Sequence, residues 1–161
     1  MNGQAIRLRL ALEAMEGMEA RLDLSLTEDA DLFPITAAML ETPSSALVKT
    51  LDAFLKRFEQ TIDHLLRKLF PLMVAAADAR RETLPFRDVL DRLHRFSLID
   101  DPETWVSLNE LRNRLVHDYA LGKEELAADL SAAWQVSPML LQQVSLLRQY
   151  ADEHGLLVEG Q

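Results

Sequence analysis

Four side chains with useful chemistry lie within eight residues near the end of an expected helix: Arg112, Asn113, His117 and Tyr119. An arginine guanidinium can hold two phosphate oxygens at once, and a histidine can move protons near neutral pH. A tyrosine offers a hydroxyl group that can bind a ligand or be modified. Taken singly, each residue is better explained as part of a water-facing helix surface. Together they are the residue types of a site that handles phosphate groups.

Helical geometry sorts these residues onto two faces. Asn113 and His117 are four residues apart and therefore neighbours, so the amide can orient the imidazole ring. Arg112 and His117 are five residues apart and point about 140° away from each other around the axis. One straight helix does not easily aim both at a single phosphate, although the long arginine side chain could curl round. Two copies related by a two-fold axis would line one cleft with the Arg112 and His117 side chains of both chains. A homodimer is therefore expected.

Hydrophobic residues recur at helical spacing through most of the chain. Six segments have this pattern, and they lie at about 4–24, 44–69, 86–96, 102–119, 126–134 and 138–150. The connections between them are short, and no convincing strand is found. We therefore expect an all-α fold, an antiparallel bundle of five or six helices that forms one domain over 1–161. The tail from about residue 155 is expected to fray.

The clearest helix start in the chain precedes the four motif residues. Asp101 is suited to the N-cap, Pro102 to the first helical position and Glu103 to the first turn. The motif helix is therefore expected over about 102–119. Gly122 offers a stop after it.

Three further boundaries are expected from local signals. Ser25, followed three residues later by Glu28, matches a capping box and predicts that a shorter helix opens there. Pro71 is expected to kink or end the second long helix. Ser137 and Pro138 predict the cap and first turn of a separate last helix.

Composition and charge limit the classes of function. The chain of 161 residues is 48% hydrophobic, has no cysteine and contains no long apolar stretch, so a cytoplasmic protein without a membrane segment is expected. Its net charge of −9 opposes generic binding of nucleic acid. Most of the excess acid lies in residues 1–43 and 120–161, whereas residues 44–119 are close to neutral. An anion site must therefore be local and lie in the middle of the chain.

Other candidate residues have simpler explanations. His64 and His94 stand singly in amphipathic helices, where a water-facing or hydrogen-bonded role is more common than catalysis, and His154 lies in the tail. Trp105 and Trp134 are expected in the core or at a dimer interface. No spacing of histidine and carboxylate residues resembles a metal site, and no glycine-rich phosphate loop is present, so neither a metal nor a cofactor is expected.

The order of the motif residues resembles a known signature. Arg112 with Asn113 directly after it, then His117, then Tyr119 two residues later resembles the HEPN superfamily, in the form of the HepT-like toxins and their nucleotidyltransferase-associated relatives. The resemblance covers roughly residues 45–150 and is most specific over 102–121. It implies a helical bundle with a four-helix up-and-down core that commonly dimerises.

The resemblance also implies roles for the four residues. Arg112 would stabilise the charged phosphorane, and His117 would transfer protons while a ribose 2′-OH attacks the adjacent phosphate without a metal. Asn113 would support them. Tyr119 matches the tyrosine that a partner nucleotidyltransferase, the antitoxin, adenylylates to silence HepT-like toxins.

Three functions remain open from the sequence. The first is a metal-independent endoribonuclease toxin that cleaves RNA and is paired with a nucleotidyltransferase antitoxin. The second is a non-catalytic companion that presents a substrate, or its own Tyr119, to that nucleotidyltransferase. The third is a structural helical dimer in which the motif is fortuitous.

Overall fold

The computed structural model describes residues 3–79, 83–117 and 122–158, and within these ranges it is helical with no strand. In chain order the elements are α1 (Gly3–Glu28), the 3₁₀ turn η1 (Ala30–Leu32), α2 (Ala37–Glu41), α3 (Ser45–His64), the π-helical segment η2 (Leu65–Leu69), α4 (Phe70–Asp78), α5 (Phe86–Arg95), α6 (Pro102–His117) and α7 (Lys123–Glu153). The all-α prediction is confirmed. Across the described ranges, no helix combines the length and apolarity that crossing a membrane requires.

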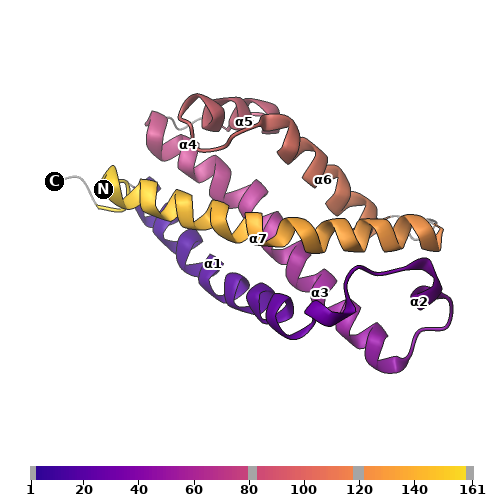
Figure 1. The fold of residues 1–161 in the computed structure, drawn as a ribbon. Coiled ribbons are helices and arrows are strands. Elements are labelled where there is room, and N and C mark those ends of the chain that lie inside the picture. Colours follow the sequence, from indigo (N-terminus) through magenta and orange to yellow (C-terminus); the bar gives the residue numbers. More distant parts are fainter. Residues whose placement is uncertain (1–2, 80–82, 118–121, 159–161) are drawn as a thin grey trace.

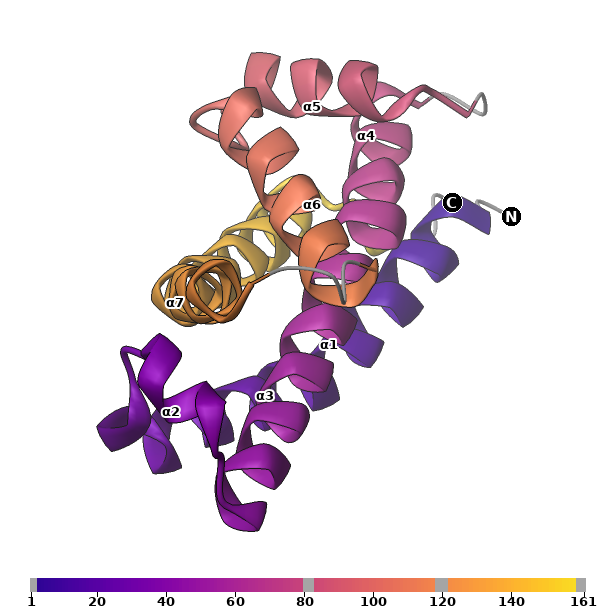
Figure 2. The same cartoon turned by 90° about the vertical axis from the view of Figure 1, so that its right-hand side faces the viewer.

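The long helical segments run in alternating directions (Figure 1). α1 leads away from the N-terminus, the run from α3 through η2 to α4 returns, α6 leads away again and α7 returns. Turned by 90°, the molecule shows α5 across one end and α2 near the other (Figure 2). α5 packs against α4 and α6, and α2 packs against α7. The predicted antiparallel bundle is confirmed.

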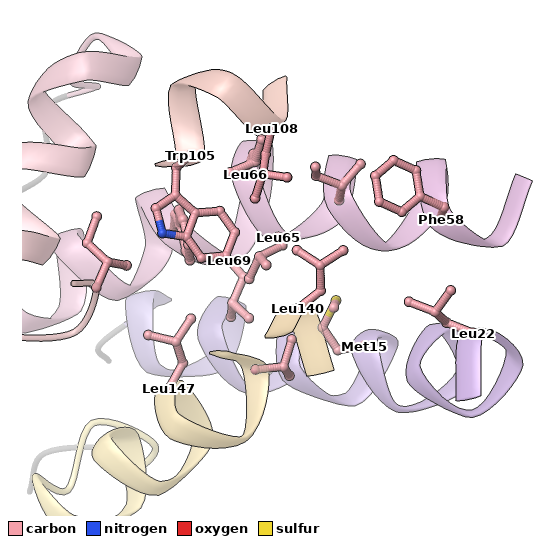
Figure 3. Close-up of a cluster of buried hydrophobic side chains, with 14 of the residues drawn as sticks. Met15, Leu22, Phe58, Leu65, Leu66, Leu69, Trp105, Leu108, Leu140 and Leu147 are labelled. Atoms are coloured by element: carbon pink, nitrogen blue, oxygen red, sulfur yellow. The ribbon is translucent and has the colours of Figure 1, made fainter. Parts of the chain in front are cut away.

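One hydrophobic core connects the long helices (Figure 3). Met15 of α1, Phe58 of α3 and Leu140 of α7 are fully buried in it. Trp105 anchors α6 to this core, where its ring and that of Phe70 form a T-shaped pair at a centroid distance of 4.9 Å. Each such side chain stabilises the fold by about 1.5–3 kcal/mol relative to its exposed state. The position of α6, and of the motif residues on it, is therefore set by packing.

The first helix is longer than its local signal suggested. α1 continues through Ser25 to Glu28, so the prediction of a new helix at Ser25 was wrong. Ser25 is fully buried, and its hydroxyl accepts a hydrogen bond from Nη1 of Arg57 at 2.7 Å. Packing against α3 thus outweighs the capping signal. The short helix α2 begins instead after Thr36, whose hydroxyl accepts from the Met39 N–H.

The second long helix does not end at Pro71. Leu65–Leu69 widen into a π-helical segment, closed by a hydrogen bond from the Phe70 N–H to the Leu65 carbonyl. α4 follows directly, with Pro71 in its first turn. Proline lacks an N–H and its ring clashes with the carbonyl four residues back in a regular helix. The disturbance is therefore taken up by a wider turn in a helical run that continues.

The last helix is also continuous. α7 passes through Pro138, so the prediction of a separate helix starting at Ser137 was wrong. Ser137 is buried, and its hydroxyl donates to the Ala133 carbonyl at 2.7 Å. A proline inside a helix costs about 3 kcal/mol. Fully buried residues on both sides of it, including Ala133 and Leu140, offset that cost.

The motif helix begins where it was expected. Oδ1 of Asp101 accepts a hydrogen bond from the Glu103 N–H at 3.0 Å, directly ahead of α6. Gly122 forms the N-cap of α7, so its role is at the start of that helix. Tyr119 lies outside the described residues.

Candidate functional site

The candidate site is built around Arg112, which lies at the edge of the buried face of α6. That face consists of four residues at helical spacing, Trp105, Leu108, Leu111 and Leu115. Arg112 follows the last but one of them, and its side chain is only 12% exposed. It projects toward α3, which packs against α6. The guanidinium is thus enclosed between two helices and needs polar partners there.

Both terminal nitrogens of the Arg112 guanidinium have partners. Nη2 donates to Oδ2 of Asp63 at 2.7 Å and to Oε1 of Glu59 at 3.4 Å, both on α3. Nη1 donates to Oδ1 of Asn113 at 3.2 Å and lies 3.4 Å from Nε2 of His117. Nε is buried and finds no hydrogen-bond partner among the described residues. The carboxylates therefore hold one edge of the guanidinium, and the other edge is turned toward His117.

Asp63 is shared between two arginines. Its Oδ2 accepts from Arg112, and its Oδ1 accepts from Nη1 of Arg67 at 2.7 Å. The side chains of Arg67 and Asp63 are 50% and 28% exposed, so this second pair is open to water. The negative charges of Asp63 and Glu59 balance the positive charges of the two arginines. In this arrangement the cluster has no surplus charge with which to attract an anion.

His117 lies at the exposed end of the described part of α6. Arginine can only donate hydrogen bonds, so the contact with Arg112 requires a lone pair on Nε2. The neutral ring then has its proton on Nδ1. The distance of 3.4 Å is longer than an ordinary hydrogen bond. An incoming hydroxyl or phosphate oxygen can therefore replace this contact at little cost.

The structure brings three of the predicted site residues together in one chain. Of the two arrangements that helical geometry left open, the structure has the one in which the long arginine side chain curls round the helix, so that Nη1 of Arg112 lies 3.4 Å from Nε2 of His117. Asn113 was expected to orient His117, but its oxygen instead accepts from Arg112. The prediction for Tyr119 falls outside the described residues.

Sequence reasoning missed Glu59, Asp63 and Arg67. These residues are spaced four apart, so they share one face of a helix. That stripe of charge was visible in the sequence. Its partner on α6 was not, because 49 residues separate Asp63 from Arg112.

The opposite side of α6 has a different character. There Nε and Nη2 of Arg114 donate to the two carboxylate oxygens of Asp129 on α7, at 3.0 and 3.1 Å. These hydrogen bonds raise the pKa of the Arg114 guanidinium above its ordinary value. A groove of about 490 Å³ runs beside it and includes Asp101, Glu103 and Leu108 in its lining. No histidine is among the described residues that line this groove, so it does not repeat the arrangement around Arg112.

The other histidines have ordinary structural roles. Nε2 of His64 donates to the Ala11 carbonyl at 2.8 Å. Nδ1 of His94 lies 3.3 Å from the carbonyl oxygen of Ile99. Hydrogen-bonded, non-catalytic roles were expected for both, and these contacts fit them. His154 stacks on the ring of Tyr150 at the end of α7.

Both tryptophans pack against other aromatic side chains. Trp105 is 3% exposed in the core, and Trp134 stacks on Phe33 with a centroid distance of 3.9 Å. Among the residues that the structure describes, no three histidine or carboxylate side chains gather as metal ligands do.

No protein-family model, curated protein or solved structure matches this chain. The interpretation of the site therefore depends on the motif and on the contacts around Arg112.

Proposed function

We propose that this protein is a metal-independent endoribonuclease of the HEPN type, the toxin of a pair whose antitoxin is a nucleotidyltransferase. The supporting observation is the 3.4 Å separation between Nη1 of Arg112 and Nε2 of His117 at the exposed end of α6. Cleavage of RNA by its own 2′-OH needs a proton acceptor beside a donor for the charged phosphate oxygen. These two atoms supply both.

The proposed reaction begins with an RNA phosphate beside Arg112 and the neighbouring 2′-OH beside His117. Nε2 of His117 removes the proton as the 2′-oxygen forms a bond to phosphorus. Nη1 of Arg112 donates to a non-bridging oxygen and stabilises the phosphorane. The bond to the 5′-oxygen then breaks, and that oxygen leaves as a hydroxyl with a proton from the imidazolium ring or from water. The products are a 2′,3′-cyclic phosphate and a 5′-hydroxyl.

Purified protein should cleave single-stranded RNA in EDTA and leave cyclic phosphate ends. His117→Ala should reduce the rate by on the order of 10²-fold or more, because it removes the proton acceptor. His154→Ala is the matched control, since that exposed histidine stacks on Tyr150 at the end of α7. Strict dependence on magnesium, or equal losses in the two variants, would overturn the proposal.

We also propose that the active form is a homodimer. A two-fold axis near the exposed end of α6 would place two pairs of Arg112 and His117 in one cleft. Light scattering measures the mass in solution. If each site uses one chain's own pair, mixed dimers of Arg112→Ala and His117→Ala protein should remain inactive. Recovery of activity on mixing would mean that the two groups act across subunits.

Regulation in this proposal takes place at Tyr119. The partner would transfer AMP from ATP, with the phenol oxygen bonding to the α-phosphorus, its proton passing to a base on the partner and pyrophosphate leaving. The added phosphate would compete with RNA for Arg112. This role comes from the resemblance to HepT-like toxins.

A second candidate function is supported by the charges around Arg112. Asp63 and Glu59 neutralise the guanidinium, as suits a protein that does not bind RNA phosphates. The chain would then be a non-catalytic companion of the nucleotidyltransferase. Modification of Tyr119 without any cleavage of RNA by the unmodified protein would favour this alternative.

A further inference from the structure

We propose that Asp63, assisted by Glu59, is a positioning residue that sets both the place and the charge of Arg112. This inference rests on the proposed RNA cleavage. Asp63 does not need to touch RNA, because both of its oxygens are already engaged with arginines. Its effect on the reaction would pass through Arg112.

The place of Arg112 follows from the rigidity of its planar guanidinium. Nη2 is held by Asp63 at 2.7 Å and by Glu59 at 3.4 Å, and Nε is buried. Nη1, which donates to Asn113, is turned toward His117 and is the nitrogen placed to meet a phosphate. A long arginine side chain without these contacts has many other rotamers. Asp63 thus holds the donor where the transition state needs it.

Positioning of Arg112 favours the chemical step, but neutralisation of its charge weakens binding of the RNA substrate. Asp63 and Glu59 cancel the local positive charge, so a phosphodiester with one negative charge gains little on entering the site. The phosphorane has more negative charge and gains more from a donor already in position. Asp63 should therefore weaken binding of the substrate while it accelerates the chemical step.

Asp63→Asn separates these two effects. Its KM for RNA should fall about 3- to 10-fold, because Arg112 loses a neutralising charge. Its kcat should also fall, by on the order of 10- to 10²-fold, because the guanidinium is held less firmly. Simple damage to the fold would raise KM as kcat falls. A higher KM together with a lower kcat, or no change in either constant, would overturn the inference.

Two variants serve as controls for Asp63→Asn. Asp52→Asn changes the net charge by the same amount on the same helix, at an exposed position roughly 16 Å along the axis from Asp63. That distance exceeds the screening length of about 8–10 Å, so KM and kcat should stay near their original values. Asp63→Glu restores the charge with a longer side chain. It should return KM toward the original value and recover kcat only in part.

Binding of a 2′-O-methyl RNA, which lacks the attacking hydroxyl, tests the charge effect without catalysis. Fluorescence anisotropy should show about 3- to 10-fold tighter binding to Asp63→Asn protein, at a temperature at which circular dichroism shows both proteins folded. Adding Arg112→Gln should abolish the gain. A gain that persists would assign it to Arg67, released from the same carboxylate, and would overturn the inference, as would unchanged or weaker binding.

The two proposals can fail separately. If the original protein does not cleave RNA but Asp63→Asn binds the analogue more tightly through Arg112, the proposed function fails and the charge effect stands. If the protein cleaves RNA and Asp63→Asn is kinetically unchanged, the proposed function stands and the role of Asp63 fails.

Discussion

Arg112 and Arg114 lie two residues apart on α6, and both are paired with carboxylates, yet their surroundings differ. The Arg112 side chain is 12% exposed and contacts two acids, an amide and an imidazole. The Arg114 side chain is 44% exposed and forms a two-pronged pair with Asp129 alone. Arg114 has the better ion-pair geometry. Of the two, only Arg112 lies beside a histidine.

The difference shows that pairing alone does not identify a functional arginine. Arg114 connects α6 to α7 at the surface, where such pairs contribute little. Arg112 is held by α3 so that its Nη1 meets an exposed histidine. Enclosure and the neighbouring imidazole, rather than the ion pair, distinguish the candidate site.

Removal of each arginine should test this comparison most strongly. Arg112→Ala should reduce the rate of RNA cleavage in EDTA by on the order of 10²-fold or more, because the donor to the phosphorane is lost. Arg114→Ala should stay within about 3-fold of the original rate, since it removes a surface pair. Single-turnover kinetics with circular dichroism as a folding control measures both. Equal losses would remove the functional distinction between the two arginines.

Modification of Tyr119 should lower RNA cleavage at the Arg112 site whether or not Arg114 is present. Co-expression with a cognate nucleotidyltransferase should add one AMP to Tyr119 and lower cleavage by on the order of 10-fold or more, through the added negative charge and bulk. Tyr119→Phe should escape this, whereas Arg114→Ala should not. Intact-mass and peptide spectra identify the site. A confirmed active partner that leaves Tyr119 unmodified would contradict the regulatory proposal.

Stability should also separate the two positions. Arg112→Met should lower the free energy of unfolding by about 1–3 kcal/mol, because it leaves Asp63 and Glu59 without the cation that is enclosed between α3 and α6. Urea denaturation followed by circular dichroism gives the value. A smaller loss than that of Arg114→Met would mean that the Arg112 cluster does not contribute to folding as its burial suggests.

The smallest effect is expected for the pair of Arg114 and Asp129. A double-mutant cycle with alanine should give a coupling energy of about 0.2–1 kcal/mol, which added salt should reduce. The same cycle for Arg112 and Asp63 should be less sensitive to salt, because that pair is less exposed. If the coupling energies of both pairs fell equally with added salt, the pair of Arg112 and Asp63 would not be better shielded from water than the pair of Arg114 and Asp129.

Much of the fold was predictable from particular residues. Hydrophobic spacing indicated an all-α bundle, and Asp101 with Pro102 indicated the start of α6. Local signals failed at Ser25 and Ser137, which both lie inside continuous helices. At both positions the serine is fully buried, and packing outweighs a capping preference of about 1 kcal/mol.

The sequence by itself determined that the chain folds as a helical bundle, which face of each long helix is apolar, and that Arg112, Asn113 and His117 share the end of one helix. Only the tertiary structure decided where the Arg112 guanidinium points. Glu59 and Asp63 lie 53 and 49 residues away along the chain and reach it because α3 packs against α6. Helical periodicity predicts which face of a helix a residue lies on, but the rotamer of a long side chain depends on contacts with other helices, which periodicity does not predict. The carboxylates of α3 therefore determine the geometry of the site.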